Sequence, residues 1–200
     1  MAERPEVHVD SAAELREWLA ANHDRSEGVW LVTHKKTSSS GPYLPIAEIV
    51  DELIAFGWVD SVQKRVDADR SKLQITPRKP KSKWSRVNKE RVERLTAEGR
   101  MAPPGVAMVE LAKRTGTWTA LDAIERLEEP GELRAALDAE PDARRHYDAF
   151  PPSSRRAILE WIGSAKREAT REARIAETVA LARENLRAFD WPRPKPGGGG

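Results

Sequence analysis

The sequence contains no cysteine, and this absence excludes disulfide frameworks, thiolate zinc sites, redox pairs and cysteine nucleophiles. No apolar run approaches the ~20 residues that a membrane-spanning helix needs, and the first residues lack the apolar core of a secretory signal peptide. We therefore expect a cytoplasmic protein without a membrane span.

The glycine motifs of nucleotide-binding and hydrolase folds are absent as well. The chain has no P-loop, no GxGxxG fingerprint and no GxSxG elbow. Its histidines, His8, His23, His34 and His146, are scattered, and none has the i, i+4 spacing of a helical metal pair. We expect no catalytic residues, no metal and no cofactor, and hence a non-enzymatic protein; an unrecognised enzyme stays open as an alternative.

Charge is unevenly distributed along the 200 residues, although the net charge is only +2. Residues 1–60 carry 5 basic and 11 acidic side chains, whereas residues 61–100 carry 13 basic and 5 acidic ones, a local net charge of +8. The remaining hundred residues are balanced. Such a basic band is typical of sites for anions, nucleic acids or acidic partners.

The first hundred residues predict helices packed on a small antiparallel sheet. Ser11 and Glu14 have the spacing of a capping box, and an apolar stripe of helical period follows Pro45 and ends at Gly57. The expected elements are helix 12–22, strand 29–33, helix 46–56, strands 58–66 and 73–77 as an antiparallel hairpin, and a helix from 82–85 to 98. In the first hairpin strand, we expect Trp58, Val62 and Val66 on one side.

Proline and glycine divide the second half into expected helices, with Ser153 as the N-cap of one of them. These helices are 105–115, 118–127, 132–137, 142–150, 153–165 and 168–189. The fold class is therefore α+β, with an α+β unit at 1–100, a helical module at 101–190 and a disordered Pro/Gly tail at 191–200.

The segment 76–91 combines seven basic side chains with one tryptophan. Helical spacing places Asn88 and Arg91 on the apolar face of Trp84, where polar groups need partners. We expect a ligand site beside Asp60, formed by Trp58, Asp60, Arg78, Lys81, Trp84, Asn88 and Arg91. The structural alternative is an Arg91–Asp60 ion pair, with Asn88 capping a strand carbonyl.

Several motifs resemble the YdeI/OmpD-associated family, also called bacteriocin-protection. They are Phe56-Gly57-Trp58-Val59-Asp60, the run from Thr76 to Ser85, Asn88, Arg91 to Leu95, Gly99-Arg100-Met101, Pro151-Pro152-Ser153, Arg155-Arg156, Trp161-Ile162, Ala165-Lys166, Thr170-Arg171 and Arg174-Ile175. The resemblance implies a YjbR/CyaY-like N-terminal unit, a helical C-terminal module, and a bacterial stress-tolerance protein associated with resistance to bacteriocins or antimicrobial peptides. Because the acidic ridge of iron-binding frataxin-like relatives is absent, no metal is carried over.

Two partner classes follow from these features. The first is an anionic small molecule or a peptide, received by Arg78 and Lys81 with apolar area from the tryptophan rings, and a protein partner fits the same site. The second is nucleic acid, held by the basic segment 76–91. The missing reading helix and aromatic strand platform argue against the second class.

Overall fold

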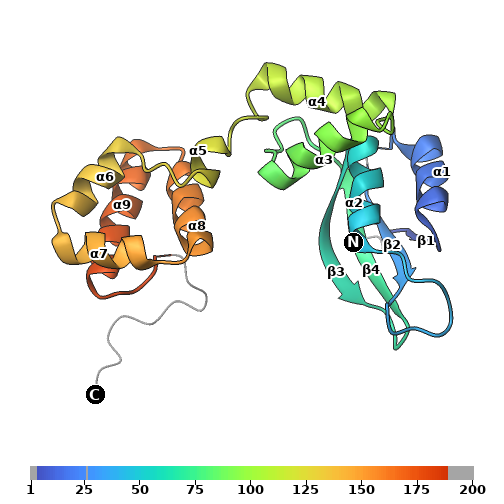
Figure 1. Cartoon of the computed structure of the whole chain (residues 1–200), viewed down its shortest axis with the longest axis horizontal. Coiled ribbons are helices and arrows are strands. Elements are labelled where there is room, and N and C mark those ends of the chain that lie inside the picture. Colours follow the sequence, from blue (N-terminus) through green and yellow to red (C-terminus); the bar gives the residue numbers. More distant parts are fainter. Residues whose placement is uncertain (1–3, 26, 189–200) are drawn as a thin grey trace. The chain divides into compact units, whose positions relative to one another are not determined.

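The computed structural model describes residues 4–25 and 27–188, and the chain divides into two compact units, Met1–Ala120 and Leu121–Gly200 (Figure 1). The predicted tail at 191–200 lies outside the described residues. No helix among the described residues is long and apolar enough to cross a bilayer. Each unit has its own apolar core and is described by itself.

The first unit is an α+β fold, as predicted, but its four-stranded sheet is mixed rather than purely antiparallel. Its elements are β1 (Glu6–His8), α1 (Ala12–Asn22), β2 (Val29–His34), α2 (Ile46–Ala55), β3 (Trp58–Arg65), β4 (Arg70–Pro77), α3 (Arg86–Ala97) and α4 (Pro103–Thr115). The strand order is β1-β2-β4-β3, with β1 parallel to β2 and the other pairs antiparallel. The mixed character comes from β1, a strand that the sequence did not predict.

Local capping explains where the first helices begin and end. The Ser11 hydroxyl accepts a hydrogen bond from the Glu14 backbone N–H at 3.2 Å, as the capping box predicts, while the Glu14 carboxylate accepts from the N–H of Asp10 at 2.9 Å. Helix α2 ends before Gly57, which has a φ of 73° and therefore adopts a conformation that a side chain would strain.

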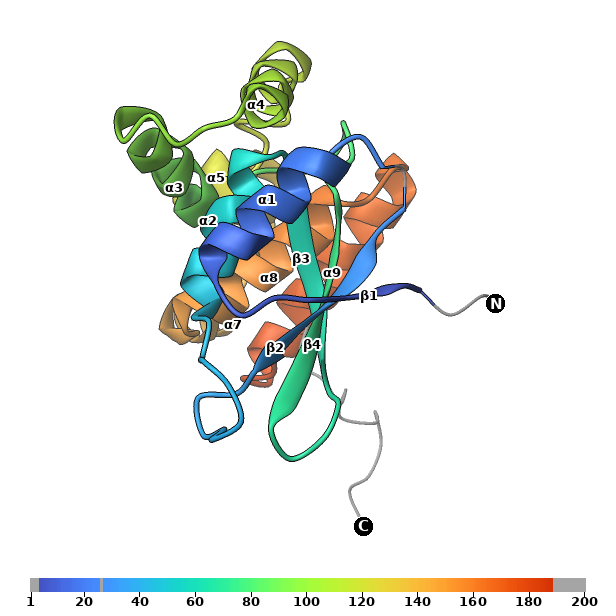
Figure 2. The same cartoon turned by 90° about the vertical axis from the view of Figure 1, so that its right-hand side faces the viewer.

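One face of the sheet carries the main core of this unit. Leu31 and Ile75 of the sheet share an apolar cluster with Leu15 of α1 and Leu53 of α2, and all four are buried. Figure 2 shows β3 and β4 running side by side to their connecting turn, with α1 in front of α2. Both helices therefore cover the same face.

The predicted apolar side of the first hairpin strand is wrong beyond its first residue. Trp58 is buried, but Val62 and Val66 are exposed. The pairing explains the difference, because Asp60 lies opposite Ile75 and Gln63 lies opposite Leu73. This bulge places one extra residue in β3 and reverses the alternation after it.

Helices α3 and α4 pack on α2 and bury a second apolar cluster, Ile54, Trp84, Val92, Leu95, Val109 and Ala112. Ser85 caps α3, because its hydroxyl accepts from the Asn88 backbone N–H at 3.4 Å, so Trp84 lies before the helix and not in it. At Gly105 of α4, an added Cβ would lie 2.1 Å from the Ala55 carbonyl oxygen. A glycine is therefore required at this helix crossing.

The second unit is entirely helical in the residues that the structure describes, as predicted. It contains α5 (Asp122–Glu125), α6 (Gly131–Asp138), α7 (Pro141–Ala149), α8 (Pro152–Gly163) and α9 (Glu168–Arg183). The helix predicted at 118–127 is limited to the four residues of α5, and Pro151 rather than Ser153 is the N-cap of α8, because Pro152 fits the first helical position. The core gathers around Tyr147 and Ile158.

Candidate functional site

A buried arginine–tryptophan stack lies where β4 leads into α3. The Arg78 guanidinium carbon is 3.9 Å from the centroid of the Trp84 ring, and both side chains are almost completely buried, at 4% and 1% exposure. The Arg78 Nη1 donates to the Lys83 carbonyl at 3.2 Å, and its backbone N–H donates to Gly57 at 2.9 Å. The segment between the two stacked residues therefore closes over the guanidinium.

Two hydrogen-bond donors in this stack have no partner among the described residues. They are the Nε of Arg78 and the Nε1 of Trp84, and both are inaccessible to solvent. A buried donor without an acceptor costs about 1–3 kcal/mol, and more when it is charged. Because both groups can only donate, the chemistry that would satisfy them is an oxygen acceptor, and the positive charge favours an anionic one.

Burial also makes the charged form of Arg78 energetically unfavourable. Desolvation lowers the pKa of Arg78 to about 10, while the carboxylate of Asp60 acts in the opposite direction. Asp60 is half-buried on β3, at the bulge. Arg78 therefore stacks on Trp84 and interacts electrostatically with Asp60.

Lys81 lies on the exposed loop that covers this stack. Its neighbours Lys79 and Lys83 are exposed too. None of these three lysines forms an ion pair among the described residues. The rim of the Arg78–Trp84 stack is therefore basic and accessible.

Two of the other predicted site residues, Trp58 and Arg91, do not join the stack. Trp58 belongs to the main core, where its ring meets Trp18 edge to face at 5.6 Å and its Nε1 donates to the His23 carbonyl. Asn88 is half-buried in the first turn of α3. The predicted Arg91–Asp60 ion pair is wrong, because Arg91 bonds Asp51 at 2.5 Å instead.

Two adjacent carboxylates of α2 pair with three arginines of the basic band, Arg91, Arg94 and Arg100. Asp51 accepts from Arg91 and Arg94 of α3 at 2.5 and 2.6 Å, and both residues of the acidic pair, Asp51 and Glu52, are buried. Glu52 accepts from Arg16 and Arg100 at 2.7 and 2.6 Å. These arginines join α1, α2 and α3, so their ion pairs serve the fold. The sequence missed this arrangement because the partners lie about forty residues apart.

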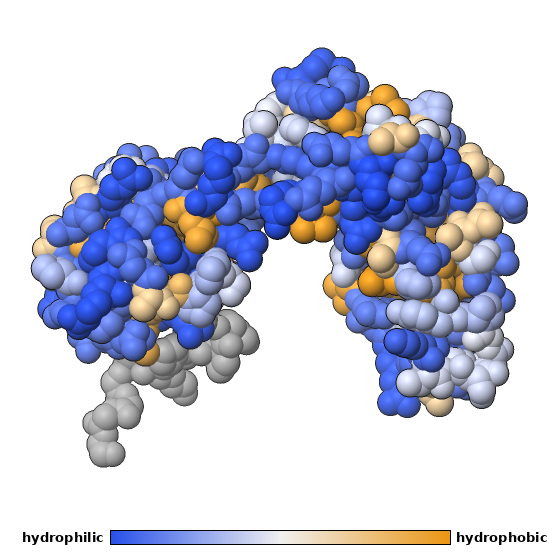
Figure 3. All heavy atoms as spheres, viewed as in Figure 1, coloured by the Kyte–Doolittle hydropathy of each residue, from blue (hydrophilic) through white to orange (hydrophobic). Residues whose placement is uncertain are grey.

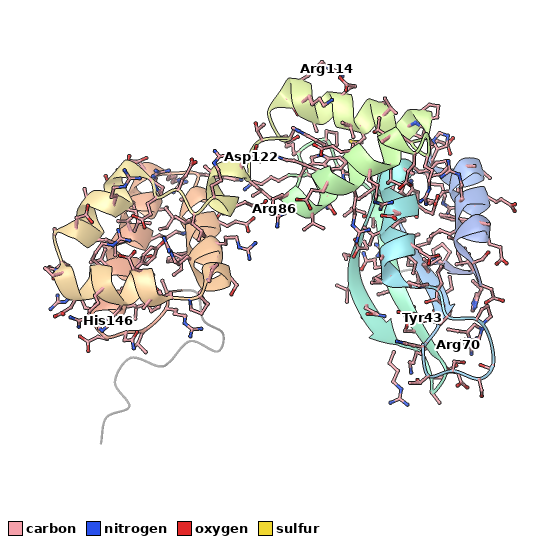
Figure 4. The ribbon with its side chains drawn as sticks, in the orientation of Figure 1. Tyr43, Arg70, Arg86, Arg114, Asp122 and His146 are labelled. Carbon is pink, nitrogen blue, oxygen red and sulfur yellow. The ribbon has the colours of Figure 1, made fainter. Side chains whose placement is uncertain are left out.

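A polar pocket of about 470 Å³ lies at the other end of the sheet. Its lining residues are His8, Asp10, His34, Ser40, Asp67, Asp69 and Arg70. Figure 4 places Tyr43 and Arg70 at this end, near the tip of the β3–β4 hairpin. Two of the scattered histidines thus meet here, yet the described residues contain no group of three His, Asp or Glu side chains arranged to hold a metal ion.

The pocket also lacks the geometry of a catalytic triad. His34 Nε2 lies 3.6 Å from Asp10 Oδ1, and its Nδ1 lies 3.4 Å from the hydroxyls of both Ser38 and Ser40. These separations exceed the ~2.6–3.2 Å that supports proton transfer, and Asp10 is exposed. We therefore assign no catalytic role to this pocket.

Comparison with protein families divides the chain much as the two units do. Residues 7–108 match the model described as "Domain of unknown function (DUF8412)". The chain belongs to the DUF8412 family. Residues 126–185 of this DUF8412 protein match a second model, "Bacteriocin-protection, YdeI or OmpD-Associated", which confirms the predicted resemblance for the C-terminal helices. The motifs at 56–101 lie within the DUF8412 match instead. No curated protein and no solved structure matches the chain, so a YjbR/CyaY-like relationship stays a prediction.

Proposed function

We propose that this protein is a non-enzymatic binding protein whose first unit captures a carboxylate or phosphate group at Arg78 and Trp84. The observation that carries the proposal is the pair of buried N–H donors without acceptors on two stacked side chains. Anionic oxygens that reach these donors would satisfy them and neutralise the guanidinium. Charged hydrogen bonds of this kind contribute about 1.5–3 kcal/mol each.

The exposed lysines of residues 79–83 supply the approach to this site. Their ammonium groups attract an anion before it reaches the stack, and such steering acts mainly on the association rate. The ligand enters when this loop moves, because the loop carbonyl of Lys83 occupies one guanidinium nitrogen. The face drawn in Figure 3 is mostly hydrophilic with separate apolar patches, and this favours a charged ligand over an apolar one.

The family description suggests the setting in which this capture operates. A bacteriocin-protection domain in the second unit links the proposed anion site to tolerance of bacteriocins or antimicrobial peptides. The ligand is then an anionic small molecule or the carboxylate of a peptide, and the protein acts in the bacterial cytoplasm. The basic segment 76–91 is a weaker site for nucleic acid, because its tryptophan is buried and cannot stack on a base.

A thermal-shift experiment with inorganic phosphate, pyrophosphate, citrate and a short peptide with a free carboxyl terminus tests the proposal. At least one probe should raise the melting temperature of the wild type, since a ligand at a hundred times its Kd stabilises by about 2.7 kcal/mol. Arg78→Met should abolish the shift and Lys81→Ala should weaken it. Arg114→Met is the matched control, because it removes one exposed charge from the same unit.

The result that would overturn the proposal is equally specific. If no probe shifts the wild type, or if Arg78→Met and Arg114→Met reduce the shift equally, the stack is not an anion site. Measuring unliganded melting temperatures of all variants separates lost binding from lost folding.

A further inference from the structure

The sheet has a second face, opposite the helices, with a different chemistry. Because successive residues of a strand point to opposite faces, the residues next to the core residues along each strand point away from α1 and α2. We call this surface the open face; it comprises Glu6, His8, Trp30, Lys64, Lys72 and Gln74. The register places these residues on four neighbouring strands, with Glu6 opposite Trp30, Trp30 opposite Gln74, and Lys64 opposite Lys72.

Trp30 of β2 lies on the open face within reach of two lysines, which come from β4 and β3 on the same side of it. Its ring is half-buried, and the Nζ atoms of Lys64 and Lys72 each lie 5.2 Å from the ring centroid. Lys64 reaches Trp30 from β3, across the intervening strand β4. Two ammonium groups therefore lie over an aromatic ring on this sheet surface.

The two lysines are also an unfavourable pair. Like charges directly opposite each other on neighbouring strands destabilise a sheet, and Lys64 faces Lys72 in this way. The charge of Lys72 is compensated by Glu6, whose Oε1 lies 2.5 Å from the Lys72 Nζ. Lys64 has no ion pair among the described residues. An anion bound between them would relieve the repulsion.

We propose that the open face binds single-stranded nucleic acid, with one base stacked on Trp30 and the adjoining phosphates on Lys64 and Lys72. Stacking of a base on an aromatic side chain strengthens binding about 5- to 150-fold. A single strand fits this surface because its bases are free to stack, whereas those of a duplex are not. The Gln74 amide beside the ring offers a donor and an acceptor to a base edge.

The end of the open face limits where a bound nucleic-acid strand can run. Beyond His8, the polar pocket carries Asp10, Asp67 and Asp69, and their carboxylates repel phosphates. We therefore place the phosphate contacts at the two lysines only. This predicts a salt dependence of log Kd with a magnitude of about 1.4, from two phosphates at about 0.7 each.

Fluorescence anisotropy with labelled oligo-dT of about ten nucleotides, recorded from about 50 to about 200 mM salt, tests the proposal on the full chain. Trp30→Ala should weaken binding at least about 5-fold, and Trp30→Phe should weaken it less because the phenyl ring still stacks. Lys64→Ala should lower the salt dependence by about 0.7.

Matched controls exist for both residue types. Trp161, in the second unit, has the Arg174 guanidinium carbon 5.0 Å from its ring centroid. Lys113 contacts the ring of Trp118 and forms an ion pair with Glu110, just as Lys72 contacts Trp30 and pairs with Glu6. Trp161→Ala and Lys113→Ala should leave the Kd unchanged. Far-UV circular dichroism confirms folding, and Trp30→Phe and Lys64→Ala keep the test decisive if Trp30→Ala unfolds.

Several results would overturn the assignment. These are absence of oligo-dT binding by the wild type, equal effects of Trp30→Ala and Trp161→Ala, duplex DNA bound as tightly as the single strand, or polyglutamate bound as tightly as oligo-dT. Trp30→Ala separates this site from the proposed anion site, because it should weaken oligo-dT binding and leave the thermal shift with inorganic phosphate unchanged. If Arg78→Met weakens oligo-dT binding as much as Trp30→Ala does, the nucleic acid does not bind at the open face.

Discussion

Replacing Arg78 by methionine should remove ligand binding without destabilising the protein. The lowered pKa, about 10, means that folding disfavours the charged form by about 3 kcal/mol. Since the folded-state pKa lies below the unfolded one, this penalty is present in full at neutral pH and would be relieved only above about pH 10. Methionine eliminates the penalty and fills a similar volume.

The interactions lost with the guanidinium offset much of that gain. The hydrogen bond to the Lys83 carbonyl contributes about 1.5 kcal/mol, and the stack on Trp84 contributes about 1–2 kcal/mol when it is desolvated. A methionine sulfur against the same ring restores up to about 1 kcal/mol. The free energy of unfolding of Arg78→Met should therefore lie within about 1 kcal/mol of the wild type.

Urea unfolding followed by tryptophan fluorescence measures this difference for the relevant unit. Five of the seven tryptophans, Trp18, Trp30, Trp58, Trp84 and Trp118, belong to the first unit, so the signal reports mainly on it. A loss of about 3 kcal/mol or more, which is typical when one partner of a required buried charge pair is removed, would refute the reasoning. Arg78 would then be a structural residue.

Three further substitutions test the fold. Glu52→Gln should lower the free energy of unfolding by about 1–3 kcal/mol, because it weakens the contacts of a buried carboxylate with two arginines. Glu110→Gln at an exposed pair should change it by about 0.5 kcal/mol or less in the same urea experiment. Gly105→Ala should cost more than about 2 kcal/mol from steric overlap; Gly131→Ala, with open space around it, should be tolerated, and equal melting temperatures would contradict this packing. The Arg144 guanidinium lowers the pKa of Glu129, so the stability that this carboxylate contributes should be lost as the pH falls through the lowered pKa, and Glu129→Gln should flatten an acid titration of the urea midpoint.

Local signals in the sequence predicted most elements because they depend on neighbouring residues. The cap at Ser11, the apolar stripe of α2 and the glycine at 57 all act within a few positions, and each is confirmed. Strand β1 has only three residues, too few for an alternating pattern to stand out. The β3 bulge was missed because an extra residue leaves no mark in a single strand; it becomes visible only in the pairing with β4.

Interaction partners that lie far away in the sequence distinguish the basic side chains that can bind a ligand from those that stabilise the fold. The sequence predicted the basic band and the proximity of Arg78, Trp84 and Asp60, but it assigned Arg91 to the same site. The structure pairs Arg91 with a buried carboxylate on α2 and leaves the Nε of Arg78 without a partner among the described residues. A count of charges treats these two arginines alike. Their partners distinguish them, because a satisfied arginine holds helices together, whereas an unsatisfied buried one costs free energy that an anionic ligand would recover.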